Sequence, residues 1–150
     1  MANHIRRQIR ERVATLVTGL STTGSRVYQS RVYALSTSTE LPCLLVYTLA
    51  EDSTKPVLCH PGTLERTITV AIEAVAKATA DLDDTLDQIC KEVETALATD
   101  FYLSGLAKDA QLTRTELQLQ GGDTPQPVGA ARMSWSVRTA TIEGIPDVVA

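Results

Sequence analysis

The sequence predicts an α/β fold of the α+β type: a mixed, mainly antiparallel sheet of four to five strands with two main helices packed on one face. Two segments repeat their apolar residues every three or four positions, which is typical of amphipathic helices. Several others alternate apolar and polar residues, which is typical of half-buried strands. Aromatic residues make up only 4% of the chain, so Leu, Val, Ile and Ala must supply most of the core. Such a core suits packed helix and sheet layers.

The two helices are predicted over residues 3–18 and 82–98. Gly19 is a plausible end for the first helix, because glycine readily adopts the left-handed conformation that follows many helices. Asp81 is expected to cap the start of the second helix. The apolar stripes that would face the sheet are Ile5, Ile9, Val13, Leu16, Val17 and Leu20 in the first helix and Leu82, Leu86, Ile89, Val93 and Leu97 in the second.

Four longer segments are predicted as strands. Residues 41–49 are apolar at nearly every position, so this strand is expected to be covered on both faces in the middle of the sheet. Residues 66–76 alternate and should form a half-covered strand, after a reversal of the chain at 55–63. Residues 112–120 and 131–142 should form a hairpin. On its second strand the side chains that face the core should be Ala131, Met133, Trp135 and Val137.

The 150 residues, of which 43% are hydrophobic and 21% charged, predict one domain over 1–150 with a single core. Segments near 21–40 and 121–129 should be exposed, because the first is rich in Ser and Thr and the second in Gly and Pro. A short strand is expected within the first of them, near 26–34. The tail at 143–150 has no apolar period and should be loose.

The cysteines and the apolar runs indicate where the chain folds. Three cysteines, two of them in apolar segments, do not suit a disulfide framework and favour folding in a reducing cytoplasm. No apolar run approaches the roughly 20 residues of a membrane span. The N-terminus becomes periodic after its arginines and does not resemble a secretory signal. Neither export nor membrane insertion is expected.

Charge is segregated along the chain. The net charge of −4 disfavours a general nucleic-acid-binding role, and no sequence-specific nucleic acid partner is expected. Residues 1–12 carry four arginines against a single acid, Glu11, whereas residues 73–100 carry eight acids against Lys77 and Lys91. The chain therefore begins basic and becomes acidic in its middle.

No residues converge on a catalytic, cofactor-binding or metal-binding site. Cys59 and His60 are adjacent, and neighbours in extended chain point to opposite sides, so they are poorly placed to act as nucleophile and base. The cysteines and histidines lack the paired spacing of a zinc site. The aspartates at 81–87 have the spacing of a helix start rather than a calcium loop. Gly121-Gly122 precedes a Pro-rich loop rather than a helix, which disfavours phosphate binding.

The remaining candidate site residues belong to subunit or partner interfaces. Tyr and Arg are enriched at the centres of interfaces, and opposite charges guide association. The alternative for the arginines and aspartates is a solvated surface, and for the tyrosines it is packing over the edge of the core. The candidates are Arg6, Arg7 and Arg10; Arg26, Tyr28, Arg31 and Tyr33 of the repeated Arg-Val-Tyr unit; Asp83, Asp84 and Asp87; and Asp123 and Gln126.

Six segments carry a family resemblance: "IRRQIRERVATLVTGL", "SRVYQSRVYAL", "LPCLLVYTLAED", "RTITVAIEAVAKA", "LDDTLDQICKEVETAL" and "MSWSVRT". In this order, and over nearly the whole chain, they resemble the tail terminator family of long-tailed bacteriophages, the minor tail protein U type. The most specific pieces are the Arg-Val-Tyr segment and the Leu-Pro-x-Leu-Leu-Val-Tyr strand. They are patterns of fold and surface rather than catalytic signatures.

The resemblance implies a structural protein of the virion, assembled in the host cytoplasm. Members of the family form a ring, typically of six subunits, on the head-proximal end of the tail tube. The ring stops polymerisation of the tube and joins it to the head. The implied partners are further copies of the chain, the tail tube protein and a neck or head-completion protein. A neck or head-completion connector is the alternative function, and a small cytoplasmic enzyme is a remote one.

Overall fold

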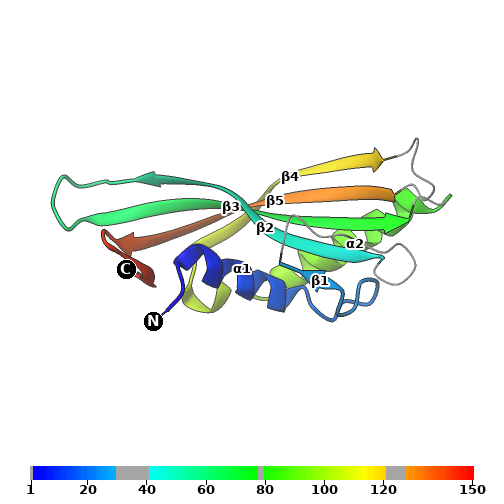
Figure 1. The fold of residues 1–150 in the computed structure, drawn as a ribbon, viewed down its shortest axis with the longest axis horizontal. Helices are drawn as coiled ribbons and strands as arrows, with labels where there is room; N and C mark the ends of the chain where they lie inside the picture. The colour runs from blue at the N-terminus through cyan, green and yellow to red at the C-terminus, as the bar shows by residue number, and fades with distance from the viewer. Residues whose placement is uncertain (1, 30–40, 78–79, 121–127) are drawn as a thin grey trace.

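The computed structural model describes residues 2–29, 41–77, 80–120 and 128–150. Figure 1 shows one long, twisted sheet with both helices on the same side of it. In chain order the elements are α1 (Ile5–Leu16), β1 (Val27–Tyr28), β2 (Cys43–Thr54), β3 (Thr63–Lys77), α2 (Leu82–Leu97), the 3₁₀ helix η1 (Leu103–Gly105), β4 (Asp109–Gln120), β5 (Val128–Ile142) and β6 (Ile145–Val149).

The described strands form a six-stranded sheet in the order β1-β2-β3-β5-β4, with β6 paired to β5. Among these strands β1 and β2 run parallel, and the other pairs are antiparallel. A mixed, mainly antiparallel sheet with two helices on one face confirms the predicted fold class. The short strands β1 and β6 raise the number of strands above the four or five expected.

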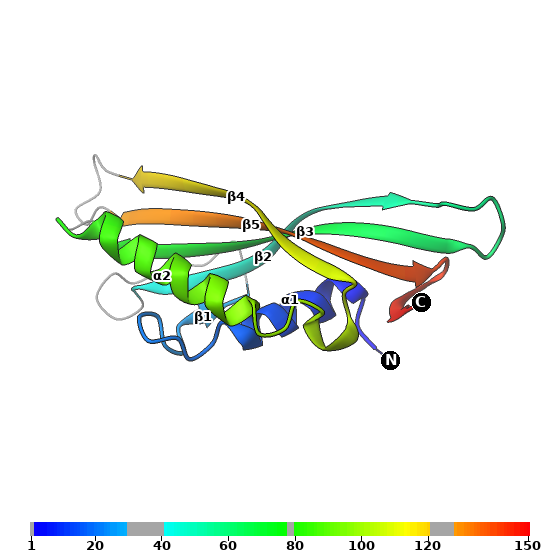
Figure 2. The same cartoon turned by 180° about the vertical axis from the view of Figure 1, so that it is seen from behind.

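The main core lies between the sheet and the two helices, which cover one face of it, as Figure 2 shows from behind. The apolar stripes of both helices are buried there against alternate residues of the strands, so the predicted periods and the inward-facing side of β5 are confirmed. The largest fully buried side chains include Ile5, Ile9, Leu44, Ile68, Ile72, Leu86, Ile89, Leu103 and Met133. A smaller apolar cluster on the opposite face contains Leu41, Cys43, Leu45, Tyr47, Ala71, Val75 and Ala130.

The helix ends agree with prediction in position but not fully in chemistry. Gly19 has φ +88°, the left-handed conformation expected just beyond α1. Asp81 is the residue before α2, but its side chain makes no capping hydrogen bond. At the start of α1 the capping residue is His4, whose Nδ1 accepts the Arg6 N–H at 3.2 Å. Burial and nearby arginine charge lower the pKa of His4, which favours the neutral ring that can accept this bond.

The prediction that residues 41–49 form a central strand is wrong in part. β2 is buried on both faces only from Cys43 to Tyr47 and then continues, mostly exposed, to Thr54. The central positions belong to β3 and β5, because β1 covers the outer edge of β2 only opposite Leu44 and Leu45. Because Cys43–Tyr47 are covered on both faces, they have the same apolar pattern as a strand that is central along its whole length.

The prediction of a loose tail is also wrong. Residues 145–149 form β6, which pairs with β5 through Ile142↔Ile145 and Thr141↔Val149. Gly144, at φ +81°, makes the reversal possible. The Gln8 side chain also donates to the Asp147 carbonyl at 2.8 Å, which ties β6 to α1. Backbone pairing and these contacts hold the segment, so no apolar period is needed.

Part of the predicted connections falls outside the described residues. Of the strand expected near 26–34, the structure places Val27–Tyr28 as β1, and residues 30–40 lie outside the described part. The centre of the β4–β5 loop, 121–127, lies outside it as well. In the described ranges, no helix is long and apolar enough to cross a membrane.

Candidate functional site

The basic surface predicted on α1 is present but partly engaged within the subunit. Arg6 is 44% exposed, and its guanidinium lies 3.6 Å from a Glu51 oxygen. Arg7 is 56% exposed and pairs with Glu11 one turn later at 2.8 Å. Arg10 is half-buried, and its Nε is covered. The exposed Arg7–Glu11 pair is individually weak, so Arg7 is able to exchange partners, whereas Arg6 lies beside the largely buried Glu51.

The Arg-Val-Tyr segment is engaged inside the subunit as far as the structure describes it. The Arg26 side chain donates to the carbonyls of Pro42 at 2.8 Å and Thr22 at 3.1 Å, which fastens the loop after α1 to the start of β2. Tyr28 is half-buried against the apolar cluster on the sheet face opposite the helices. Arg26 thus supports the fold through these two contacts. Arg31 and Tyr33 lie outside the described residues.

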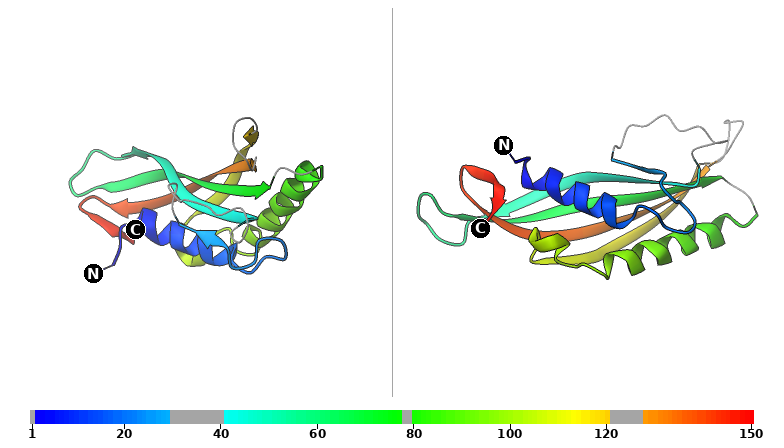
Figure 3. Two further views of the ribbon diagram at one scale, coloured as in Figure 1. Left: turned by 45° about the vertical axis from the view of Figure 1, so that its right-hand side comes forward. Right: turned by 90° about the horizontal axis from the view of Figure 1, so that it is seen from below.

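The acidic surface predicted on α2 is exposed. Asp83 and Asp84 lie in its first turn, and Asp87 follows one turn later. α2 begins near one end of the molecule, whereas α1 begins on the side of the β2–β3 hairpin, and the two helices converge at their C-terminal ends, as Figures 1 and 3 show. The arginines of α1 and the aspartates of α2 therefore do not meet within one chain. Asp123 and Gln126, the remaining candidates, lie outside the described part of the chain.

The structure adds a surface that the sequence analysis missed, the tip of the β2–β3 hairpin. The two strands extend together beyond the body of the molecule, at the end where α1 begins (Figures 1 and 2). At the tip, Leu58 is 99% exposed and Val57 is 63% exposed. The available signal was an apolar pair between two prolines in "PVLCHP", within a segment predicted only as a loop.

The base of this tip is held by Glu143. Its carboxylate pairs with Lys55 Nζ at 2.6 Å and accepts the Gly62 N–H at 2.7 Å. The Glu143 N–H in turn donates to the Gly62 carbonyl at 2.9 Å. The hydrogen bonds from Lys55 and Gly62 lower the pKa of Glu143. A Cβ at Gly62 would lie 2.8 Å from the Cys59 carbonyl oxygen, so the turn requires glycine there.

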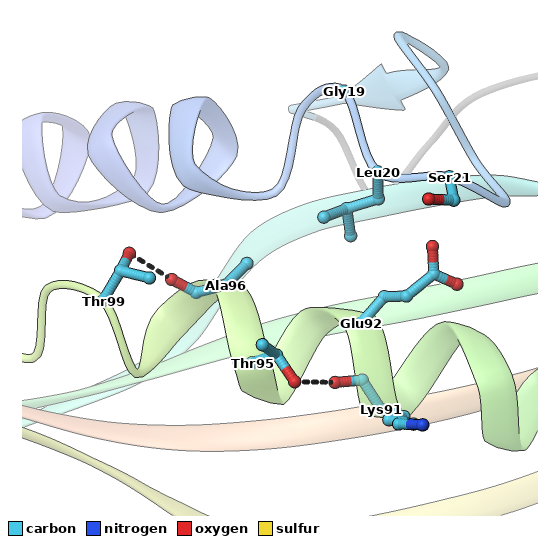
Figure 4. A pocket seen from close by; sticks show the side chains of 8 residues that line it. All are labelled: Gly19, Leu20, Ser21, Lys91, Glu92, Thr95, Ala96 and Thr99. Carbon is cyan, nitrogen blue, oxygen red and sulfur yellow. Dashed lines mark hydrogen bonds between the residues drawn. The ribbon is translucent and has the colours of Figure 1, made fainter.

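A groove of about 410 Å³ lies between α2 and the loop that follows α1. Figure 4 shows Leu20 reaching down from the loop toward Ala96, while Glu92 points up toward Ser21. Glu92 accepts the Thr22 N–H at 3.0 Å and the Thr22 hydroxyl at 2.6 Å. Burial raises the pKa of Glu92, but these hydrogen bonds outweigh it, so the pKa is lowered. They hold one wall of the groove against the other.

A second carboxylate, Asp100, ties α1 to the connection between α2 and β4. It accepts from Arg12 at 2.9 Å and from the Ser104 N–H at 2.8 Å. Ser104 and Leu103 have φ of 57° and 49°, conformations that non-glycine residues seldom adopt. The hydrogen bond from Arg12, ahead of the bonds from Ser104, lowers the pKa of Asp100. The ionised carboxylate therefore supports an unfavourable turn.

We expect Asp100→Asn to destabilise the subunit near neutral pH and to weaken its sensitivity to acid. A carboxyl group whose pKa is lowered by folding stabilises above its unfolded-state pKa, here close to 3.8, and this contribution is lost as the pH falls through the lower folded value. Urea unfolding at about pH 7 and about pH 3 measures both effects. The matched control is Asp52→Asn, an exposed carboxylate on β2. Equal acid dependence of wild type and Asp100→Asn would contradict this role.

The thiols should differ sharply in reactivity. Cys59 is exposed at the hairpin tip, whereas Cys43 and Cys90 are buried. Burial, and then the charges of Glu94 and Asp87, raise the pKa of Cys90 to about 11, which suppresses its reactive thiolate. Titration of the native protein with a thiol reagent should modify one cysteine rapidly, and Cys59→Ser should abolish this phase. Rapid modification of that variant would show that the core opens readily.

Within the described ranges, no three His, Cys, Asp or Glu residues are placed to hold a metal ion. No protein-family model matches the chain, and no curated protein matches it. Among solved structures, the chain is similar to a protein in the virion of a native gene transfer agent particle, with a TM-score of 0.35 and 13% sequence identity. That likeness covers 90% of this chain and 92% of the other. This likeness is too weak to carry an argument about the fold or the function.

Proposed function

We propose that this chain is a structural virion protein that forms a ring on the head-proximal end of a phage tail tube. The ring would end polymerisation of the tube and present the surface that joins the head. The sequence resemblance described above suggests this role. The structural observation that supports it is that the Arg-rich start of α1 and the Asp-rich start of α2 lie far apart along one elongated molecule, with the two helices running toward each other.

This placement suits a ring because cyclic symmetry uses head-to-tail contacts. One surface of each subunit meets a different surface of the next, so two surfaces of opposite charge favour that register over self-pairing. Arg6 and Arg7 are exposed near the start of α1, and Asp83, Asp84 and Asp87 are exposed near the start of α2. In the ring these residues would face each other across each boundary, and the remaining faces would meet the tail tube protein and a neck or head-completion protein.

Negative-stain electron microscopy of the purified protein mixed with purified tails tests the proposal. Rings bound only at the head-proximal end of tails, and tubes of uniform length when the protein is present during polymerisation, are the expected results. Rings that bind tail-free heads and leave tails uncapped would contradict the terminator role and indicate a neck connector. Failure to bind either particle would contradict both.

Charge reversal tests the proposed boundary. Arg6→Glu/Arg7→Glu and Asp83→Lys/Asp84→Lys/Asp87→Lys should each assemble poorly alone, and a mixture of the two should assemble in part. Each exposed pair contributes about 0–1 kcal/mol, so the effect is collective and should weaken with added salt. Arg10 is left unchanged because it is half-buried. Light scattering measures assembly, and thermal unfolding shows whether each variant is folded.

The control for these variants is Arg114→Glu, which reverses a charge on β4 whose side chain is 70% exposed. It should assemble as the wild type does. If both sets of reversed variants also assemble normally, the arginines and aspartates are a solvated surface and the boundary lies elsewhere.

A further inference from the structure

The exposed hairpin tip and the groove beside α2 are two surfaces that charge pairing leaves unused. We propose that the tip of one copy inserts Leu58 into the groove formed by residues 19–21 and α2 of a second copy. This inference rests on the proposed ring and names a contact that would join neighbouring subunits. It assigns a role to an apolar side chain that is 99% exposed in the single subunit.

The tip is built to present Leu58 outward. The Cys59 N–H donates to the Val57 carbonyl at 3.0 Å, which closes a three-residue turn with Leu58 at its apex. Below it, Glu143 joins Lys55 to Gly62, as described above. A segment already held in one conformation loses less entropy on binding, so its apolar surface contributes more to affinity.

The groove offers a matching receptor. Its lining includes the apolar side chains of Leu20 and Ala96, with Thr95 and Thr99 beside them at the end of α2, and also the charged Lys91 and Glu92. The hydroxyls of these threonines already donate to carbonyls of α2, at 2.8 and 2.6 Å. Their methyl groups are therefore available to an apolar side chain without loss of a hydrogen bond. A volume of about 410 Å³ is ample for the side chain of one leucine.

The contact can only form between two copies. The tip lies beyond the start of α1, whereas the loop after α1 and the C-terminal part of α2, which line the groove, lie at the other end of α1 (Figures 1 and 3). Two different surfaces of one chain then meet in a directional contact, which closes into a ring or continues as a filament. The tip lies at the same end as Arg6 and Arg7, and the groove borders the acidic helix. Both the contact of Leu58 with the groove and the pairing of arginines with aspartates therefore join the side of one copy that carries the tip and the start of α1 to α2 of the next copy.

The charges around the two surfaces do not oppose the contact. Residues 55–62 at the tip contain Lys55 and His60 and no acid, and Glu143 at its base is paired with Lys55. α2 contains five acids against Lys91, and of these charged residues Lys91 and Glu92 line the groove. A second copy of the chain therefore suits the groove, because the approaching tip brings no unpaired negative charge toward an acidic helix.

Oxidative cross-linking tests the contact with a thiol that the tip already carries. In Thr95→Cys, copper phenanthroline should join Cys59 of one copy to the new groove cysteine of the next, with the two thiols losing two protons and two electrons to the oxidant. Each copy then carries one cysteine at its tip and one in its groove, so disulfides can link many copies in a row. A non-reducing gel should therefore show a ladder of oligomers. Thr95→Cys/Cys59→Ser should give none. Glu94→Cys, exposed on another side of α2, should give far less.

Leu58→Asp supplies an independent measurement by sedimentation. It should raise the concentration at half-association about tenfold or more, as loss of an interface hot spot does. Leu117→Asp, which changes an exposed leucine on β4, should leave association unchanged. Normal association of folded Leu58→Asp, equal ladders from positions 94 and 95, or no ladder either in solution or on tails would overturn the proposed contact.

These results separate the contact from the proposed function. If Thr95→Cys forms rings that cap tails but gives no cross-linked ladder, the terminator role is retained and this contact is excluded. A ladder from protein that caps no tails would retain the contact and exclude the role.

Discussion

Replacing Glu51 by alanine should lower the free energy of unfolding by about 3 kcal/mol, which is typical of breaking a buried ion pair from one side. Glu51 on β2 accepts from Arg66 on β3 at 2.8 Å, and the two side chains are only 12% and 11% exposed. Without Glu51, the Arg66 guanidinium keeps its bond to the Thr141 hydroxyl at 2.9 Å but has no opposite charge beside it. Arg6 also loses its nearest acid, at 3.6 Å.

Urea unfolding of a double-mutant cycle measures this effect. Glu51→Ala and Arg66→Met should each destabilise, whereas the double variant should recover much of the loss, because no buried charge is then left alone. Glu65→Ala, an exposed acid on the same strand as Arg66, is the control and should change stability little. Additive losses in the double variant would show that the two side chains act independently.

Ile89→Ala should be as damaging for a different reason. Ile89 is fully buried between α2 and the sheet, in the main core. Its truncation removes transfer free energy and leaves a cavity, a change that costs about 2–5 kcal/mol. Thermal and urea unfolding should both register the loss. The midpoint should fall while the dependence on urea stays the same, because the change affects the native packing.

The matched control for Ile89 lies on the exposed side of the same helix. Glu94→Ala should stay within about 0.5 kcal/mol of the wild type, because surface changes away from packed or capped positions rarely do more. A loss below about 1 kcal/mol for Ile89→Ala would mean that the core collapses around the cavity, and that α2 is less firmly packed than the burial of its apolar stripe indicates.

The sequence predicted elements where side-chain chemistry repeats over many residues. The stripe that begins at Ile5 and Ile9 and the one that runs from Leu82 to Leu97 both face the core, because a helix needs one apolar side to pack on a sheet. The alternation at Ile68, Val70 and Ile72 likewise gives β3 its buried face. These periods follow from the geometry of a single element and require no knowledge of its neighbours.

Features that depend on distant neighbours were predicted poorly. β6 forms because its backbone pairs with β5 and because Gln8 reaches Asp147, contacts that leave no period in the sequence. The sequence also did not indicate that the guanidinium of Arg26, a predicted interface residue, donates to two carbonyls of its own chain. The sequence likewise did not predict that Leu58 projects from the hairpin tip or that a groove lies beside Ala96, because both features appear only in the folded chain.

The central ladder of the sheet sets when this chain can fold. β3 pairs with β5 along its full length, from Thr63↔Ile142 to Lys77↔Val128, and the intervening chain contains α2 and β4. Closing so long a loop before its contacts form slows folding, which places such topologies toward the millisecond-to-second range. During synthesis, the edge of β3 that receives β5 cannot be paired along its full length until residue 142 has left the ribosome, even though α1, β2 and α2 have already been made. Folding of the chain therefore depends on a late closure of the sheet, and slow synthesis would expose β3 to aggregation for longer.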